Sequence, residues 1–244
     1  QVPASEYNPT EFIDTNIIGA KNLLEQSFNN NVQTIVALST DKAAAPINLY
    51  GATKLCSDKL FVSSNQYYGN KMKASIVRYG NVMNSRGSVL PIFTTCANKN
   101  IPFPITDEKM TRFNITIEDG VKMIFFAIKN AKGGEIFVPK LPSFRVIDLA
   151  KAVKNNFEKK IIGIRPGEKL HETMFTESDA HLTLEFKNHY VITPSSIEFN
   201  SKINYKKNKL GEIGKRVKNE ISYNSKENKE FLNINQIKKL IKNN

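Results

Sequence analysis

The chain has 244 residues, of which 40% are hydrophobic and 24% charged, with two cysteines and a formal net charge of +12. This length and composition predict one sizeable core plus a small lobe, and the two scattered cysteines exclude a disulfide framework or a zinc site, so no metal site is expected. Every apolar run is shorter than the roughly 18 residues of a membrane span, and no signal peptide is visible, so we expect a cytoplasmic protein without a membrane partner.

Residues 9–28 have the spacing of an amphipathic helix, with apolar positions at Phe12, Ile13, Ile17, Leu23 and Leu24. Nowhere does the chain contain the Gly-x-x-Gly-x-x-Gly turn that brings backbone amides to the pyrophosphate of a dinucleotide. The chain also begins with glutamine rather than methionine. We therefore expect an N-terminally truncated piece of a longer protein, and the alternative is a natural protein that lost its cofactor-binding half.

Residues 34–38 (TIVAL) form a short apolar run, rich in β-branched residues and without alternation, which predicts a buried parallel strand. Thr40, Asp41 and Lys42 follow this run directly. The carboxyl ends of strands face the ligand crevice in open α/β sheets, so these three side chains are candidate site residues.

Tyr50 and Lys54 are four residues apart, so on one helix they share a face, with Cβ atoms about 5–6 Å apart. An ammonium group beside a phenol favours the phenolate and lowers its pKa, which makes the tyrosine a usable base. Thr40 is expected to hydrogen-bond the same hydroxyl. These residues predict a proton-transfer site.

The tyrosine–lysine spacing alone is weak evidence, because it occurs three times in the chain. The pairs Tyr67/Lys71 and Tyr205/Lys209 lie in polar segments, and their simplest interpretation is a solvated tyrosine near a solvated lysine. Tyr50/Lys54 differs because a predicted strand precedes it and an amphipathic helix follows. Cys56 in that helix is expected to be a small buried residue.

The remaining elements alternate between strands and helices, which predicts an α/β fold: a partial Rossmann-like, doubly wound parallel sheet without its first strands and glycine loop, with a small C-terminal substrate lobe. The expected domains are the remainder of a dinucleotide-binding domain (1–100), a mainly substrate-binding lobe with segments that return to the sheet (101–194), and a C-terminal extension (195–244). Strands are expected at 74–79 and 135–138, helices at 90–100, from 118, and at 146–157, and short strands and loops at 102–117.

The extension carries most of the positive charge, since residues 195–244 contain 12 Lys and Arg against 5 Glu, or +7 of the +12. Its lysines alternate with Asn and Ile, and no basic surface interleaved with aromatic residues is apparent. We therefore exclude nucleic acid as a partner.

Five separated motifs carry a family resemblance: residues 39–46 (STDKAAAP), 50–54 (YGATK), 78–82 (RYGNV), 110–113 (MTRF) and 165–172 (RPGEKLHE). Through them the chain resembles the extended short-chain dehydrogenase/reductases, and within these the inverting UDP-N-acetylglucosamine 4,6-dehydratases of the pseudaminic acid pathway. The resemblance covers essentially the whole chain. It implies a UDP-sugar substrate, an NADP cofactor held in part by Tyr50 and Lys54, and a homo-oligomer when the protein is full length.

A 4,6-dehydration removes a proton from O4 and a hydride from C4, eliminates water across C5–C6, and returns the hydride to C6. Tyr50 is expected to take the O4 proton, assisted by Lys54 and Thr40, while Asp41 and Lys42 supply a base near C5 and an acid near O6. The resemblance associates Asp-Lys with inversion at C5 and Asp-Glu with retention. Lys42 acts as a base only if its pKa is lowered, which we expect from burial next to Lys54. The alternative is a structural Asp41–Lys42 ion pair.

The resemblance also implies substrate contacts. Arg112 and Arg165 are expected to bind the UDP pyrophosphate, because guanidinium groups offer paired donors to phosphate oxygens. Glu168 is expected on the ribose or uracil side, with Asn81 and Val82 at a substrate-contacting strand end. The alternative for residues 165–168 is an ordinary surface turn.

The function expected from this resemblance is an inverting UDP-N-acetylglucosamine 4,6-dehydratase. One alternative is a nucleotide-sugar 4-epimerase, which needs Tyr50 and Lys54 but not Asp41 and Lys42, and another is an inactive remnant of the fold. The segments that distinguish NADP from NAD lie outside the chain. The 244 residues by themselves are expected to be poorly soluble, to bind no dinucleotide and to have no dehydratase activity.

Overall fold

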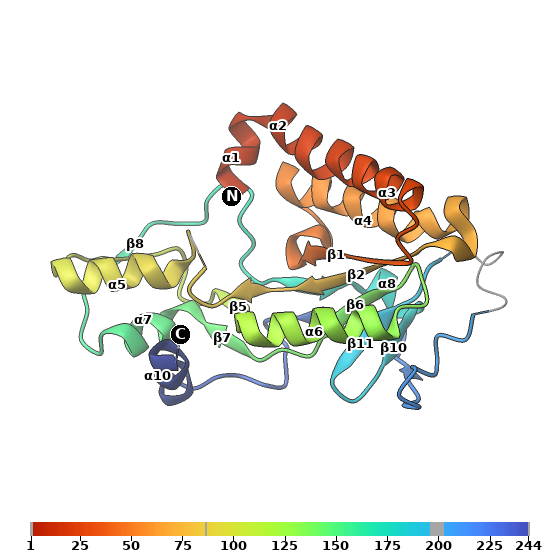
Figure 1. The fold of residues 1–244 in the computed structure, drawn as a ribbon. Coiled ribbons are helices and arrows are strands. Elements are labelled where there is room, and N and C mark those ends of the chain that lie inside the picture. The colour runs from red at the N-terminus through yellow and green to blue at the C-terminus, as the bar shows by residue number, and fades with distance from the viewer. Residues whose placement is uncertain (1, 86, 196–202, 244) are drawn as a thin grey trace.

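A computed structural model describes residues 2–85, 87–195 and 203–243, and its centre is a mixed six-stranded sheet (Figure 1). Three parallel strands form one half, and three strands that pair antiparallel form the other. The strand order is β1 (Thr34–Thr40), β2 (Lys73–Tyr79), β6 (Ile136–Pro139), β11 (His189–Ile192), β10 (Thr183–Glu185) and β12 (Lys215–Arg216).

Helices cover both faces of this sheet, which confirms the predicted doubly wound α/β class (Figure 1). On one face lie α1 (Val2–Tyr7), α2 (Pro9–Ile13), the π-helical turn η1 (Asp14–Ile18), α3 (Gly19–Asn29) and α4 (Leu49–Tyr68). On the other lies α6 (Ile117–Asn130). The predicted helix over 9–28 is present as α2, η1 and α3, but Ile13 and Leu23 of its expected apolar face are exposed.

Strand β1 is less buried than predicted, because it lies at the edge of the sheet and pairs only with β2 among the described residues. Its first four residues are half-buried, and Leu38 is 43% exposed. Cys56 on α4 is also exposed, so the expectation of a buried cysteine there is wrong.

A second body of structure, called the lobe below, packs around its own apolar cluster. The cluster includes Phe93, Phe103, Leu149 and Ile237, so the expected boundaries at residues 100 and 195 cut through it. The lobe's elements are α5 (Val89–Lys99), β4 (Phe103–Ile105), β7 (Ser143–Arg145), α7 (Val146–Val153), β8 (Lys159–Ile161) and α10 (Ile234–Asn243). Strands β3 (Asn81–Val82) and β5 (Thr111–Ile115) pair with each other and pack Val82, Phe113 and Ile115 on the main apolar cluster. Helix α7 ends four residues before the predicted Phe157.

The C-terminal extension is built into the fold rather than appended to it. Strand β13 (Tyr223–Asn224) pairs with β9 (Thr173–Phe175), and the buried Tyr223 hydroxyl accepts from the Leu141 amide at 2.7 Å and donates to the Leu141 carbonyl at 3.0 Å. Helix α10 then packs on α7. Within the described ranges, no helix is both long and apolar enough to cross a bilayer.

Candidate active site

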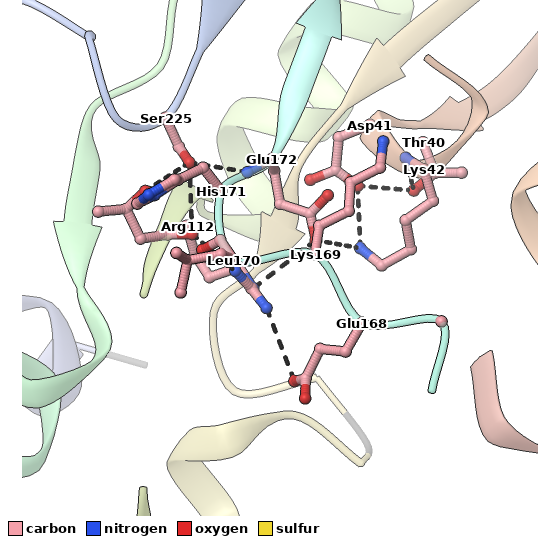
Figure 2. Close-up of polar contacts among 12 residues, drawn as sticks. Thr40, Asp41, Lys42, Arg112, Glu168, Lys169, Leu170, His171, Glu172 and Ser225 are labelled. Carbon is pink, nitrogen blue, oxygen red and sulfur yellow. Dashed lines mark hydrogen bonds and ion pairs between the residues drawn. The ribbon is translucent and has the colours of Figure 1, made fainter. Parts of the chain in front are cut away.

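A cavity of about 220 Å³ lies where the strand ends of the sheet meet the lobe. It brings together five of the residues singled out in the sequence: Lys42, Asn81, Arg112, Arg165 and Glu168. Two further charged residues, Lys169 and Glu172, line the same cavity and had no role in the sequence interpretation. Figure 2 shows Lys42, Arg112 and Glu172 converging from the end of β1, from β5 and from the loop before β9.

The end of β1 is a compact hydrogen-bonded turn. Strand β1 passes into the short 3-10 helix η2 (Asp41–Ala43), where the Thr40 hydroxyl accepts from the Lys42 amide at 3.3 Å and donates to Asp41 Oδ1 at 3.0 Å. Lys42 Nζ pairs with the same Asp41 oxygen at 2.9 Å. Asp41 is fully buried, and its Oδ2 has no hydrogen-bond partner among the described residues.

Glu172 completes this group from the opposite side. Its Oε1 lies 3.4 Å from Lys42 Nζ and 3.7 Å from Arg112 Nε, and the residue is only 2% exposed. In the sequence, the available signal is a charged residue two positions before the apolar residues Met174 and Phe175, which are fully buried.

The expected lowering of the Lys42 pKa is wrong. Burial alone lowers this pKa, but the charges of Asp41 and Glu172 and the hydrogen bond with Asp41 outweigh burial, so the net pKa is raised. Lys42 is therefore an ammonium ion held between two carboxylates. The alternative of an Asp41–Lys42 ion pair describes its resting state correctly.

Tyr50 and Lys54 both lie on α4, but Lys54 is not among the groups that shift the pKa of Tyr50, contrary to expectation. Burial raises the Tyr50 pKa, and the charge of Lys42 and a side-chain hydrogen bond with Thr40 act in the opposite direction. Lys54 Nζ instead donates to the Leu38 carbonyl at 2.8 Å, and burial lowers its pKa. Lys42, rather than Lys54, is thus the cation that favours the Tyr50 phenolate.

The start of α4 is fixed by contacts that also hold the turn at residues 165–168. Asn48 caps the helix by accepting from the Gly51 amide at 2.7 Å, and its Nδ2 donates to the Gly167 carbonyl at 2.7 Å. A Cβ at Gly51 would lie 2.3 Å from the Lys42 carbonyl oxygen, so the close approach of helix and strand end requires glycine. From α1, the Ser5 hydroxyl accepts from the Tyr50 amide at 3.2 Å.

The two arginines differ in their surroundings. Arg112 is buried, donates to the carbonyls of Thr111 and Leu170 at 2.7 and 3.1 Å, and lies 3.6 Å from Glu168 (Figure 2). Arg165 is exposed at the cavity edge. Residues 165–168 form a hydrogen-bonded turn with a positive φ of 74° at Gly167, as the turn alternative expects, and this turn lines the cavity.

Asn81 and Val82 of β3 have different environments. Asn81 lines the cavity, and its Oδ1 is buried without a partner among the described residues, so it is available to a ligand. Val82 packs against the main apolar cluster and is not among the cavity-lining residues, so its expected substrate contact stays a prediction. The two environments differ because strand alternation turns neighbouring side chains to opposite sides.

The other tyrosine–lysine pairs and the histidines do not enter the cavity. Tyr67 is 80% exposed, and the Tyr205 hydroxyl donates to the Gly133 carbonyl at 2.6 Å. His171 hydrogen-bonds Thr111 on the far side of Arg112 (Figure 2). In the part of the chain that the structure describes, no group of three or more His, Cys, Asp or Glu side chains could hold a metal ion.

The sequence of the chain is similar to those of known proteins. Residues 1–194 match the family model described as polysaccharide biosynthesis protein. The chain is 50% identical over 242 residues to a UDP-N-acetylglucosamine 4,6-dehydratase (inverting) of Campylobacter jejuni, covering 98% of this chain and 72% of the relative. It is 36% identical over 248 residues to a UDP-glucose 4-epimerase of Rickettsia felis, covering 100% of this chain and 71% of the relative.

Among solved structures, the protein Pen of Bacillus thuringiensis superposes with a TM-score of 0.85 at 31% identity, covering 100% of this chain and 72% of that one. The similarity to an inverting 4,6-dehydratase confirms the resemblance read from the five motifs. The end of β1, the start of α4 and the turn at residues 165–168 all lie within the matched residues 1–194. The chain belongs to the polysaccharide biosynthesis protein family, in which it is similar to the inverting UDP-N-acetylglucosamine 4,6-dehydratases.

Proposed function

We propose that this protein is an NADP-dependent UDP-N-acetylglucosamine 4,6-dehydratase that inverts C5. The observation that carries the proposal is the Asp41–Lys42 pair at the end of β1, whose lysine lines the same cavity as Arg112. A 4-epimerase reacts only at C4, so it needs neither a base at C5 nor an acid at the C6 hydroxyl. The 50% identity to a relative of that name supports the proposal.

The residues proposed to hold NADP fit a nicotinamide nucleotide. Lys54 Nζ donates to the Leu38 carbonyl, and the Leu38 side chain beside it is exposed at the edge of the sheet. The Lys54 ammonium is therefore a donor, and the Leu38 carbonyl an acceptor, for the hydroxyls of a cofactor sugar. Tyr50 lies on the same helix. The chemistry that bound NADP supplies is acceptance of a hydride from C4 and its return to C6.

The chain's own residues account for the proton movements. Tyr50 takes the O4 proton, with its phenolate favoured by Lys42 and Thr40. The resulting C4 ketone acidifies the C5 hydrogen, which Lys42 removes as a neutral amine. We assign the acid for the C6 hydroxyl to Asp41: it takes up a proton from solvent and gives that proton to the hydroxyl, which leaves as water, and its unpartnered Oδ2 is the oxygen free to carry the proton.

The proposed substrate contacts follow from the charge and polarity of the side chains that line the cavity. We assign the UDP diphosphate to Arg112 and Arg165, the ribose or uracil side to Glu168, and a sugar hydroxyl or amide to Asn81. Arg112 is held in place by two backbone carbonyls, so its guanidinium is preorganised for an anion.

Mass spectrometry of the product distinguishes dehydratase from epimerase, which the similarity to the Rickettsia relative makes the second candidate. The protein encoded by the full reading frame is incubated with UDP-N-acetylglucosamine and NADP. We expect a product lighter than the substrate by one water, because the C6 hydroxyl is eliminated. A product of unchanged mass with altered C4 configuration would replace our proposal by the epimerase.

A further inference from the structure

Lys42 lies between two buried carboxylates rather than in a simple ion pair. Asp41 Oδ1 is 2.9 Å from its Nζ, and Glu172 Oε1 is 3.4 Å away (Figure 2). Each carboxylate also has a second oxygen, Asp41 Oδ2 and Glu172 Oε2, that is buried without a hydrogen-bond partner in the described part of the chain. Unpartnered carboxylate oxygens are costly in a protein interior, which indicates that they serve the reaction.

The position of Glu172 is fixed from behind by the C-terminal extension. The Ser225 hydroxyl accepts from the Glu172 amide at 2.9 Å, and the Ser225 amide donates to the Glu172 carbonyl at 2.8 Å. The Ser225 hydroxyl also lies 2.7 Å from that of Thr111, which precedes Arg112. The backbone of Glu172 is therefore clamped while its carboxylate remains directed at Lys42.

We propose that Glu172 is a positioning residue that holds Lys42 and takes its proton before C5 is deprotonated. This inference rests on the proposed dehydratase function. In the first step an N–H bond of Lys42 breaks and an O–H bond forms on Glu172 Oε1, which turns the ion pair into a neutral amine and a carboxylic acid. The amine then takes the C5 proton, and the electrons of the C5–H bond pass into the C4 ketone.

Arg112 links this step to substrate binding, because it is shared between Glu172 and the proposed diphosphate site. Burial raises the Glu172 pKa and the charge of Asp41 raises it further, while Lys42, Arg112 and Lys169 lower it. A diphosphate that neutralises Arg112 weakens one of these lowering influences, so proton transfer from Lys42 becomes easier once substrate is bound. The ionisable groups around the pair are Asp41 of η2, Tyr50 of α4, Arg112 of β5, and Glu168 and Lys169 of the loop.

The pH dependence of turnover tests the proposal. From about pH 6.5 to about pH 8.5, Lys42 and Glu172 together keep one proton, and the fraction of molecules with a neutral Lys42 amine and a protonated Glu172 does not change with pH. Wild-type kcat is therefore expected to be flat over this range. In Glu172→Gln, Lys42 must lose its proton to solvent. We expect kcat to fall by about 10²-fold near pH 7 and then to rise about tenfold per pH unit.

Three controls separate this role from a structural one. Glu172→Asp keeps a carboxylate, so its reduced kcat is expected to stay flat with pH. Glu135→Gln makes the same change at a buried carboxyl directly before β6, outside the cavity, and is expected to leave kcat and its profile unchanged. Calorimetric binding of UDP to Glu172→Gln is expected to be unchanged or tighter, because an anion beside Arg112 has been removed.

A loss of kcat in Glu172→Gln that does not vary with pH, or a loss of UDP binding together with kcat, would overturn the proposal. So would a wild-type kcat that already rises tenfold per pH unit, a result that does not depend on any variant folding. These outcomes differ from failure of the proposed function, which would show as a wild-type protein that releases no product lighter by one water.

Discussion

Replacing Lys42 by alanine in the full-length protein is expected to lower the rate of dehydration by about 10²–10⁴-fold, the range for loss of a general base. The variant lacks the amine that removes the C5 proton, while Tyr50 and the fold persist. Steady-state turnover of UDP-N-acetylglucosamine, together with the circular dichroism spectrum and thermal midpoint, measures both effects. Asp41 loses its ion-pair partner in this variant, so Lys42→Met, which keeps most of the side-chain volume, is measured in parallel.

The matched control is Lys129→Ala, because Lys129 is exposed on α6, outside the residues that line the cavity. It removes the same charge from the molecule without touching the site and is expected to retain wild-type turnover. Wild-type-like turnover by Lys42→Ala would refute the role of Lys42 as the C5 base.

The second large effect concerns stability. Asp58 of α4 and Arg78 of β2 form a fully buried ion pair at 2.9 Å, and the Ser39 hydroxyl donates to the same Asp58 oxygen at 2.8 Å. Arg78 also donates to the Met174 carbonyl at 2.9 Å. This group joins α4, β1, β2 and β9 directly behind the site.

Asp58→Ala leaves the Arg78 charge buried without its carboxylate, which is expected to lower the free energy of unfolding by about 3–5 kcal/mol. Urea denaturation measures the change. The control is Glu118→Ala, which breaks an exposed pair with Lys122 on α6 and is expected to cost no more than about 0.5 kcal/mol. Equal losses of unfolding free energy in the two variants would show that the buried pair contributes no more to stability than the exposed pair.

The sequence was sufficient to predict the features that depend on local pattern. The apolar run before Thr40 predicted a strand, and the rule that strand ends face the crevice placed Asp41 and Lys42 at the site. Arg112, Arg165 and Glu168 were expected there only through the family resemblance, and the structure brings all three to the cavity of Lys42.

The features that failed depend on contacts between distant segments. The pKa of Lys42 is raised first by its neighbour Asp41 and then by Glu172, which is 130 positions later in the chain, and no local pattern shows that Lys42 and Glu172 meet. Lys54 has the correct spacing from Tyr50, yet its ammonium is bound to the Leu38 carbonyl, a contact set by the packing of α4 against β1.

The measurement that tests the central claim most directly is NMR of the product formed in deuterated water. The account has Lys42 remove the C5 proton and a solvent-derived hydron return to C5 on the opposite face. It therefore predicts a 4-keto-6-deoxy sugar that carries deuterium at C5 with inverted configuration. A product that keeps its original C5 configuration, or one without deuterium at C5, would contradict the account.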